Sequence, residues 1–117
     1  MNRRHRLRGR AAFLAVKGSR ASTSSRSLRV AIAENGLDVA RVGFAVPRAA
    51  GGAVQRNRIR RRLRELLRPR LADLAGVDVV ITVRREAARL SGPELAADLE
   101  RCTTGAQARR AAAEVRP

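Results

Sequence analysis

Residues 41–67 read RVGFAVPRAAGGAVQRNRIRRRLRELL, and within this stretch the spacing of the apolar residues changes. Residues 41–46 favour a strand, which the Pro and Gly residues of 47–52 bring to an end. Over residues 53–74 the apolar side chains recur with the period of an α-helix, which predicts a helix laid on a sheet. Pro69 should kink or shorten that helix near its end. The apolar stripe consists of Ile59, Leu63, Leu66, Leu67, Leu71 and Leu74.

A second strand candidate precedes this stretch, at residues 28–33. Residues 34–38 link the two candidates and contain Asn35-Gly36, a strong signal for a hairpin turn. We therefore expect the two strands to pair antiparallel. Further upstream, residues 11–16 predict a short helix, and residues 19–27 predict a flexible connection rich in Ser, Thr and Arg.

The downstream half adds one strand and one helix. Val77–Val83 reads VDVVITV, a β-branched and nearly continuous apolar run that is typical of a central strand buried on both faces. A Ser-x-x-Glu capping box begins at Ser91 and opens a helix. From Thr103 the chain is small, polar and rich in Arg, so we expect it to fray. The predicted order is helix, two strands, helix, strand, helix. The buried side of the last helix would carry Leu95, Leu99 and Cys102.

The chain length and the rare residue types limit the number of domains and the kinds of cross-link or metal site. At 117 residues the chain has room for one domain. We place this domain at residues 9–102, between a basic, flexible N-terminal tail (1–8) and a flexible C-terminal tail (103–117). Cys102 is the single cysteine and His5 the single histidine, so an internal disulfide and a transition-metal cluster are both excluded.

The charge balance is the most unusual property of the composition. Lys and Arg number 26 against 10 Asp and Glu, a formal net charge of +16, and Lys17 is the only lysine. Such an excess is costly on a compact surface unless a polyanion offsets it, which favours nucleic acid or an anionic membrane surface as partner. However, no apolar run approaches the roughly 20 residues that span a bilayer, and no apolar signal region follows the basic first residues. We therefore expect a cytoplasmic protein that contacts no membrane.

The densest feature is an arginine cluster at the start of the predicted helix, made up of Arg56, Arg58, Arg60, Arg61, Arg62 and Arg64. The ordinary interpretation of such a helix is a basic face exposed to solvent. Here, however, the charged residues of the cluster are all positive, and like charges four residues apart destabilise a helix. An anionic partner would relieve this repulsion. Arg56 and Arg60 lie close to the direction of the apolar stripe, so they are either buried or project past the end of the sheet. We favour the second, because guanidinium groups beside helix N-terminal amides would make a phosphate-binding corner. The residues that point away from the stripe are Arg58, Arg61, Arg62, Arg64 and Arg68.

These residues resemble a known family. Residues 41–48, RVGFAVPR, and 51–65, GGAVQRNRIRRRLRE, are similar to the signature region of the bacterial ribonuclease P protein subunit. That family has a Gly–apolar–Ser–Val segment, Ser-Lys-Lys, Ala-Val, and then Arg-Asn-Arg followed by a basic pair and Arg-Glu. The resemblance covers roughly residues 5–102. It also includes Arg6-Leu7, Phe13-x-x-Val16, Val77-Asp78-Val79-Val80 and Arg84.

The resemblance implies an α+β fold, a two-layer α/β sandwich with a small, mostly antiparallel sheet. Such a fold also occurs in the second domain of a ribosomal protein, and it includes a left-handed βαβ crossover, against the usual right-handed preference. The implied function is that of the protein subunit of a ribonucleoprotein that removes the 5′ leader from precursor tRNA. The RNA subunit performs Mg²⁺-dependent hydrolysis, so no catalytic residue is expected in this chain. The implied partners are the catalytic RNA and precursor tRNA, and no DNA.

The resemblance also implies roles for individual residues. Arg56 and Asn57 would lie near Mg²⁺ at the cleavage site, and Arg48 matches the first lysine of the Lys-Lys pair. The residues expected to contact RNA are Arg48, Arg56, Asn57, Arg58, Arg60, Arg61, Arg62 and Arg64. A cleft between the first helix and the sheet would receive the leader, with Phe13, Lys17 and Arg29 as the residues expected there.

This chain departs from the family pattern at several positions. Pro47 stands where Ser is usual, and Ala49 replaces the second lysine. Lys17 and Ala31 stand where other members often carry aromatics, so the cleft would depend more on Arg29, Lys17 and Phe13. Phe13 itself has two interpretations, as a core residue or as a stacking platform for an unpaired base.

Two other functions remain open from the residues alone. A structural RNA-binding protein of the ribosome would share the size, the charge and a mixed α/β fold. A self-sufficient nuclease is disfavoured, because Glu65, Asp73 and Asp78 show no paired-carboxylate spacing suited to a two-metal site.

Overall fold

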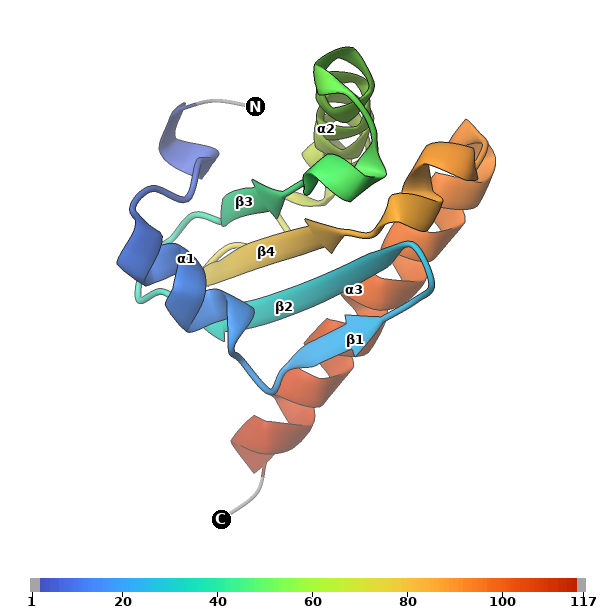
Figure 1. The fold of residues 1–117 in the computed structure, drawn as a ribbon. Coiled ribbons are helices and arrows are strands. Elements are labelled where there is room, and N and C mark those ends of the chain that lie inside the picture. Colours follow the sequence, from blue (N-terminus) through green and yellow to red (C-terminus); the bar gives the residue numbers. More distant parts are fainter. Residues whose placement is uncertain (1–2, 116–117) are drawn as a thin grey trace.

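One mixed sheet carries three α-helices in the computed structural model, which describes residues 3–115 (Figure 1). The strands lie in the order β1-β2-β4-β3, with β3 and β4 parallel and the other neighbours antiparallel. The expected α+β class with a mostly antiparallel sheet is therefore confirmed. The strands are β1 (Ser22–Ser24), β2 (Leu28–Glu34), β3 (Arg41–Ala45) and β4 (Val77–Val83). The helices are α1 (Arg10–Lys17), α2 (Ala53–Leu67) and α3 (Gly92–Val115).

The predicted hairpin between β2 and β3 is wrong, because β4 lies between them. The turn at Asn35-Gly36 forms, but it carries the chain past the end of β4 to its far edge. The Asn35 amide donates to the Gly76 carbonyl at 3.0 Å, and the Gly76 amide donates to the Val39 carbonyl at 3.2 Å. The physical reason is the apolar character of β4, which is buried at every residue except the half-buried Thr82. A strand of this kind is stable only with neighbours on both edges and helices over its faces.

Helices cover the two faces of the sheet unequally. α1 lies on one face, whereas α2 and α3 lie on the other (Figure 1). The larger core fills the space beneath α2 and α3, and strand alternation selects its members. From the strands it takes Leu28, Val30, Ile32, Val42, Val77, Val79, Ile81 and Val83, and from the helices Ile59, Leu63, Leu67, Leu95, Leu99, Cys102 and Ala106.

α2 is shorter than the apolar stripe suggests. It ends at Leu67 and continues as a 3-10 helix at Arg68–Arg70, which contains Pro69. The predicted shortening at Pro69 is therefore confirmed, and the chain reaches β4 through a series of turns. Leu74 belongs to these turns but is still buried in the core, so the stripe identified a core position outside the helix.

Regular structure extends beyond the expected domain boundaries at both ends. α3 continues to Val115, and Thr103 and Ala106 are fully buried, so the expected fraying from Thr103 is wrong. The helix continues because β1, which was expected to be a flexible connection, packs beneath it. At the other end, Arg3–His5 forms a 3-10 helix, and Arg6 pairs with Val42 at the free edge of β3.

Candidate nucleic-acid interface

The arginine cluster lies on α2, along the helix surface that the core does not use. Gly51, with a φ of 131°, turns the chain from the 3-10 helix Arg48–Ala50 toward the start of α2. Ile59, Leu63 and Leu67 then anchor the helix on the sheet. The exposed members of the predicted set are Arg48, Asn57, Arg58, Arg61 and Arg62, and the half-buried ones are Arg56, Arg60 and Arg64.

None of the α2 arginines from Arg56 to Arg64 forms an ion pair within residues 3–115. Three acidic residues pair with arginines outside α2: Asp78 with Arg41, Glu100 with Arg70, and Asp98 with Arg101. The acid on α2 itself is Glu65, and it pairs with Arg68 at 3.0 Å, one turn beyond the cluster. The positive charge of the cluster is therefore not cancelled internally. An electropositive helix surface of this kind is the electrostatic signature of nucleic-acid binding.

Arg60 and Arg64 turn toward the free edge of the sheet. Arg64 lies over the ring of Phe44, 5.7 Å from its centroid, and Arg60 donates to Asn57 Oδ1 at 2.9 Å. Both line a cavity of about 160 Å³, together with Arg6 from the N-terminal segment. Three guanidinium groups thus border one small cavity that no carboxylate lines. Such a cavity suits a phosphate group.

Arg56 and Arg60 were expected either to be buried or to project past the end of the sheet. Both are half-buried, and the Nε of Arg56 is buried without a hydrogen-bond partner in the described part of the chain. Arg60 reaches the cavity beside β3 instead of the core beneath α2.

The residues predicted for the second site, the leader cleft, lie on the opposite face of the sheet. Here α1 packs over a row of small residues that cross the central strands: Ala31, Val80 and Gly43. All three are buried. The ring of Phe13 approaches β3 so closely that a Cβ at Gly43 would lie 3.0 Å from two of its carbons. Phe13 is half-buried, so it is a packing residue with part of its ring accessible.

The next row along the strands is not fully covered. Arg29, Thr82 and Ala45 lie side by side on β2, β4 and β3, and all three are half-buried. The hydroxyl of Thr82 is buried without a hydrogen-bond partner among the described residues. Figure 1 shows α1 over one end of this face, with the ends of β3 and β4 that lead to α2 and α3 uncovered by it.

Arg29 and Lys17 meet at the end of α1. The Nη1 of Arg29 donates to the Lys17 carbonyl at 2.7 Å, and its Nη2 donates to Ser22 Oγ at 3.2 Å. Arg29 thus joins α1 to the sheet, while the Lys17 side chain is exposed. The three expected cleft residues therefore lie around α1, on the face opposite to α2.

Sequence reasoning missed three residues of these surfaces. Arg6 was placed in a flexible tail, Phe44 was seen only as part of a motif, and Thr82 only as part of a buried strand. Strand alternation could have placed Phe44 and Thr82 on opposite faces. Arg6-Leu7 was part of the family resemblance, but nothing in the sequence placed Arg6 beside α2, because its position depends on a bridge to Val42, which is distant in sequence.

The part of the chain that the structure describes has no group of three or more His, Cys, Asp or Glu residues that could hold a metal ion. No helix within residues 3–115 is both long enough and apolar enough to cross a membrane. Cys102 is buried in the core, and this burial raises the pKa of its thiol.

The fold and these two surfaces define a class: small, basic α+β proteins with an arginine-rich helix on one face of the sheet and a short helix over part of the other. Residues 1–107 match the Ribonuclease P family. The chain is 43% identical over 102 residues to the ribonuclease P protein component of Nocardioides sp., which covers 84% of this chain and 87% of that one. The chain is 41% identical over 103 residues to the component of Gluconacetobacter diazotrophicus, covering 86% and 89% of the two chains.

A solved structure gives the same result. A Staphylococcus aureus RNase P protein mutant, described as defective in mRNA degradation activity, superposes with a TM-score of 0.82 at 25% identity, covering 89% of each chain. The chain therefore belongs to the ribonuclease P protein family, the protein subunit of a tRNA-processing ribonucleoprotein. None of these findings favours the structural ribosomal protein that the residues alone left open.

Proposed function

We propose that the chain binds the catalytic RNA of ribonuclease P through α2 and holds the 5′ leader of precursor tRNA on the α1 face of the sheet. It thereby promotes endonucleolytic removal of the leader, with hydrolysis performed by the RNA subunit in the cytoplasm. The observation that carries the proposal is the set of α2 arginines without an acidic partner among the described residues.

Each surface has a different physical task. Arginines on α2 neutralise phosphates and release their counterions, which gives affinity without sequence preference. On the α1 face, the half-buried row of Arg29, Thr82 and Ala45 offers a guanidinium and little bulk. An extended strand of RNA could lie along it with a base against Phe13. Binding both RNAs on one rigid sheet would position the scissile bond, and positioning needs no catalytic side chain.

Mg²⁺ enters this proposal as an ion of the RNA. Arg56 is a cation, and the Oδ1 of Asn57 already accepts a hydrogen bond from Arg60. These residues offer no ligand set of their own for a hard cation, which prefers several oxygen ligands. Their contribution near Mg²⁺ would be to hold the RNA phosphates that bind the ion.

The salt dependence of RNA binding tests the proposal. Replacing Arg58 and Arg61 together by Ala should weaken binding of the catalytic RNA and flatten the slope of log affinity against log salt by about one to two units. A matched control, Arg20→Ala with Arg109→Ala, removes the same charge from exposed sites outside α2. An unchanged slope in the α2 variant, or an equal change in the control, would refute the role of α2. A second assay measures whether the chain lowers the Mg²⁺ concentration needed for 5′ cleavage of precursor tRNA, which a ribosomal protein would not do.

A further inference from the structure

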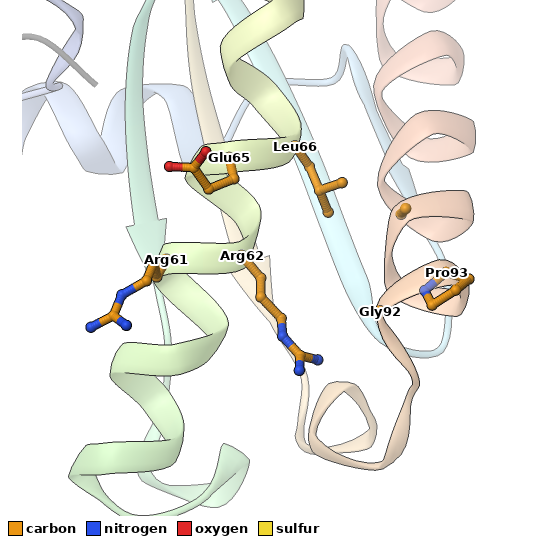
Figure 2. A pocket seen from close by; sticks show the side chains of 7 residues that line it. Arg61, Arg62, Glu65, Leu66, Gly92 and Pro93 are labelled. Carbon is orange, nitrogen blue, oxygen red and sulfur yellow. The ribbon is translucent and has the colours of Figure 1, made fainter.

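A groove of about 530 Å³ lies between α2 and the first turns of α3. Leu66 lines it from α2, and Pro93 and Ala96 line it from α3. A hollow of about 310 Å³ shares Arg62 and Gly92 with this groove and extends it toward the start of α2. Figure 2 shows Arg62 and Leu66 reaching from α2 toward the start of α3.

The floor of the groove is apolar and lacks a covering element. Leu66 is half-buried and packs against the core on one side only, while Pro93 is exposed. α3 packs mainly on β1 and β2, whereas α2 lies near β3 (Figure 1). An apolar hollow of several hundred Å³ with charged residues at its rim is typical of a ligand site.

The rim of the groove is strongly positive. Arg58, Arg61 and Arg62 border the groove and its extension, and none has a hydrogen bond or ion pair within residues 3–115. The two acids nearby are engaged. Glu65 pairs with Arg68, and Glu94 accepts a hydrogen bond from the Ser91 amide at 3.0 Å in the capping box. The groove therefore combines an apolar floor with guanidinium groups that lack counter-charges.

We propose that this groove receives an unstacked base of the RNA that binds α2. A nucleotide matches the groove in both respects, because its base has flat apolar faces and its phosphate is an anion. The base would pack on Leu66, Pro93 and Ala96, and the flanking phosphates would bind the rim arginines. Proteins recognise unpaired RNA in this way, with the base desolvated and the backbone held by cations. An acidic protein segment would also match the charge of the rim, but the partner proposed for α2 is RNA. The inference rests on the proposed function and adds that the RNA bound by α2 presents an unstacked nucleotide to the groove.

Filling the groove tests the inference. Ala96→Phe and the smaller Ala96→Leu place bulk on the floor without changing the charge. Ala97→Phe is the matched control, because Ala97 is exposed on the same helix and does not line the groove. Circular dichroism and thermal unfolding verify that each variant is folded. Binding of the catalytic RNA should weaken about fivefold to tenfold in the Ala96 variants, with an unchanged salt slope, since no phosphate contact is lost. The Ala97 variant should bind like the unmodified protein.

Cross-linking gives a second, direct measurement. Catalytic RNA containing 4-thiouridine should cross-link to the tryptic peptide of residues 90–101, which contains Pro93 and Ala96. The cross-link should disappear in Ala96→Phe and persist in Ala97→Phe. Equal affinity of folded Ala96→Phe and Ala97→Phe, or a cross-link in this peptide that persists in Ala96→Phe, would overturn the inference. Those results would leave the proposed function intact as long as the Arg58 and Arg61 variant still changes the salt slope.

Discussion

Arg41 and Asp78 are directly opposed on β3 and β4, and the guanidinium of Arg41 binds both carboxylate oxygens of Asp78. The Nε–Oδ1 and Nη2–Oδ2 distances are both 2.8 Å. The hydrogen bond to Asp78 raises the pKa of Arg41. Asn35 donates to the same carboxylate at 3.0 Å. The parallel pairing of β3 with β4 thus has its register secured by a bidentate ion pair.

Removing this ion pair should destabilise the protein. Arg41→Ala leaves the buried carboxylate of Asp78 with one of its two side-chain partners, so we expect a loss of about 1–3 kcal/mol in the free energy of unfolding. Urea denaturation measures it. Arg61→Ala is the control. Arg61 is exposed, so its replacement should lower the free energy of unfolding by less than about 0.5 kcal/mol. Equal stability of the two variants would contradict the role given to Arg41.

The packing of Phe13 on Gly43 should control leader binding. Gly43→Ala places a methyl group 3.0 Å from the ring, so Phe13 must shift. We expect weaker binding of precursor tRNA by the assembled ribonucleoprotein and unchanged binding of mature tRNA, which has no leader. Gly18→Ala is the control, because Gly18 has an ordinary φ of −83° and a Cβ there makes only normal contacts. An equal effect on both tRNAs would show that Gly43 acts elsewhere.

Contact between α3 and β1 should depend on Gly105. A Cβ at this position would lie 2.7 Å from Thr23 Oγ1. Replacing Gly by Ala inside a helix normally stabilises by about 1 kcal/mol, but here overpacking should cost about 1–3 kcal/mol. Gly105→Ala is therefore expected to lower the unfolding temperature. In a Thr23→Ala background most of that cost should disappear, and a double-mutant cycle followed by thermal unfolding checks this coupling.

Asp98 should make stability depend on pH in the acidic range. Hydrogen bonds from the hydroxyls of Ser27 and Ser25, together with Arg101, lower its pKa in the folded protein. A group with a depressed folded pKa contributes stability above its unfolded pKa of about 4, and loses it as the pH falls through the folded value. Asp98→Asn should therefore unfold at a lower temperature than the unmodified protein at pH 7. Below about pH 4 the difference in unfolding temperature between the two proteins should shrink. A difference that stays constant from pH 7 to pH 2 would contradict this account.

The elements that sequence reasoning identified are those whose own residues carry the signal. The apolar stripe of α2, the β-branched run of β4 and the capping box at Ser91 each lie within one short segment, and each was placed correctly. β1 was missed, because Ser22–Ser24 has no apolar alternation. It is a strand only because β2 and α3 surround it. The length of α3 was missed for the same reason, since the partner of Thr103 and Ala106 is that unrecognised strand region.

The pairing of β2 with β3 failed for a more general reason. A turn signal such as Asn35-Gly36 predicts that the chain reverses, and it does. It does not predict whether a third strand enters the gap, which is decided by the competition for the edges of β4. The arginines of α2 were predictable as a set, but the cavity that Arg60, Arg64 and Arg6 share was not. It forms from segments that meet only after the sheet is complete.

The central position of β4 has a consequence for the nascent chain. β2 and β3 each hydrogen-bond to β4 and not to one another, so the place between them stays empty until Val77–Val83 has been synthesised, although β1 can already pair with the other edge of β2. Pairing between segments that are distant along the chain is slow, and it leaves strand edges open to misassembly meanwhile. We expect this protein to fold late in translation and in one step, with the arginine helix tethered between two halves of an unfinished sheet until then.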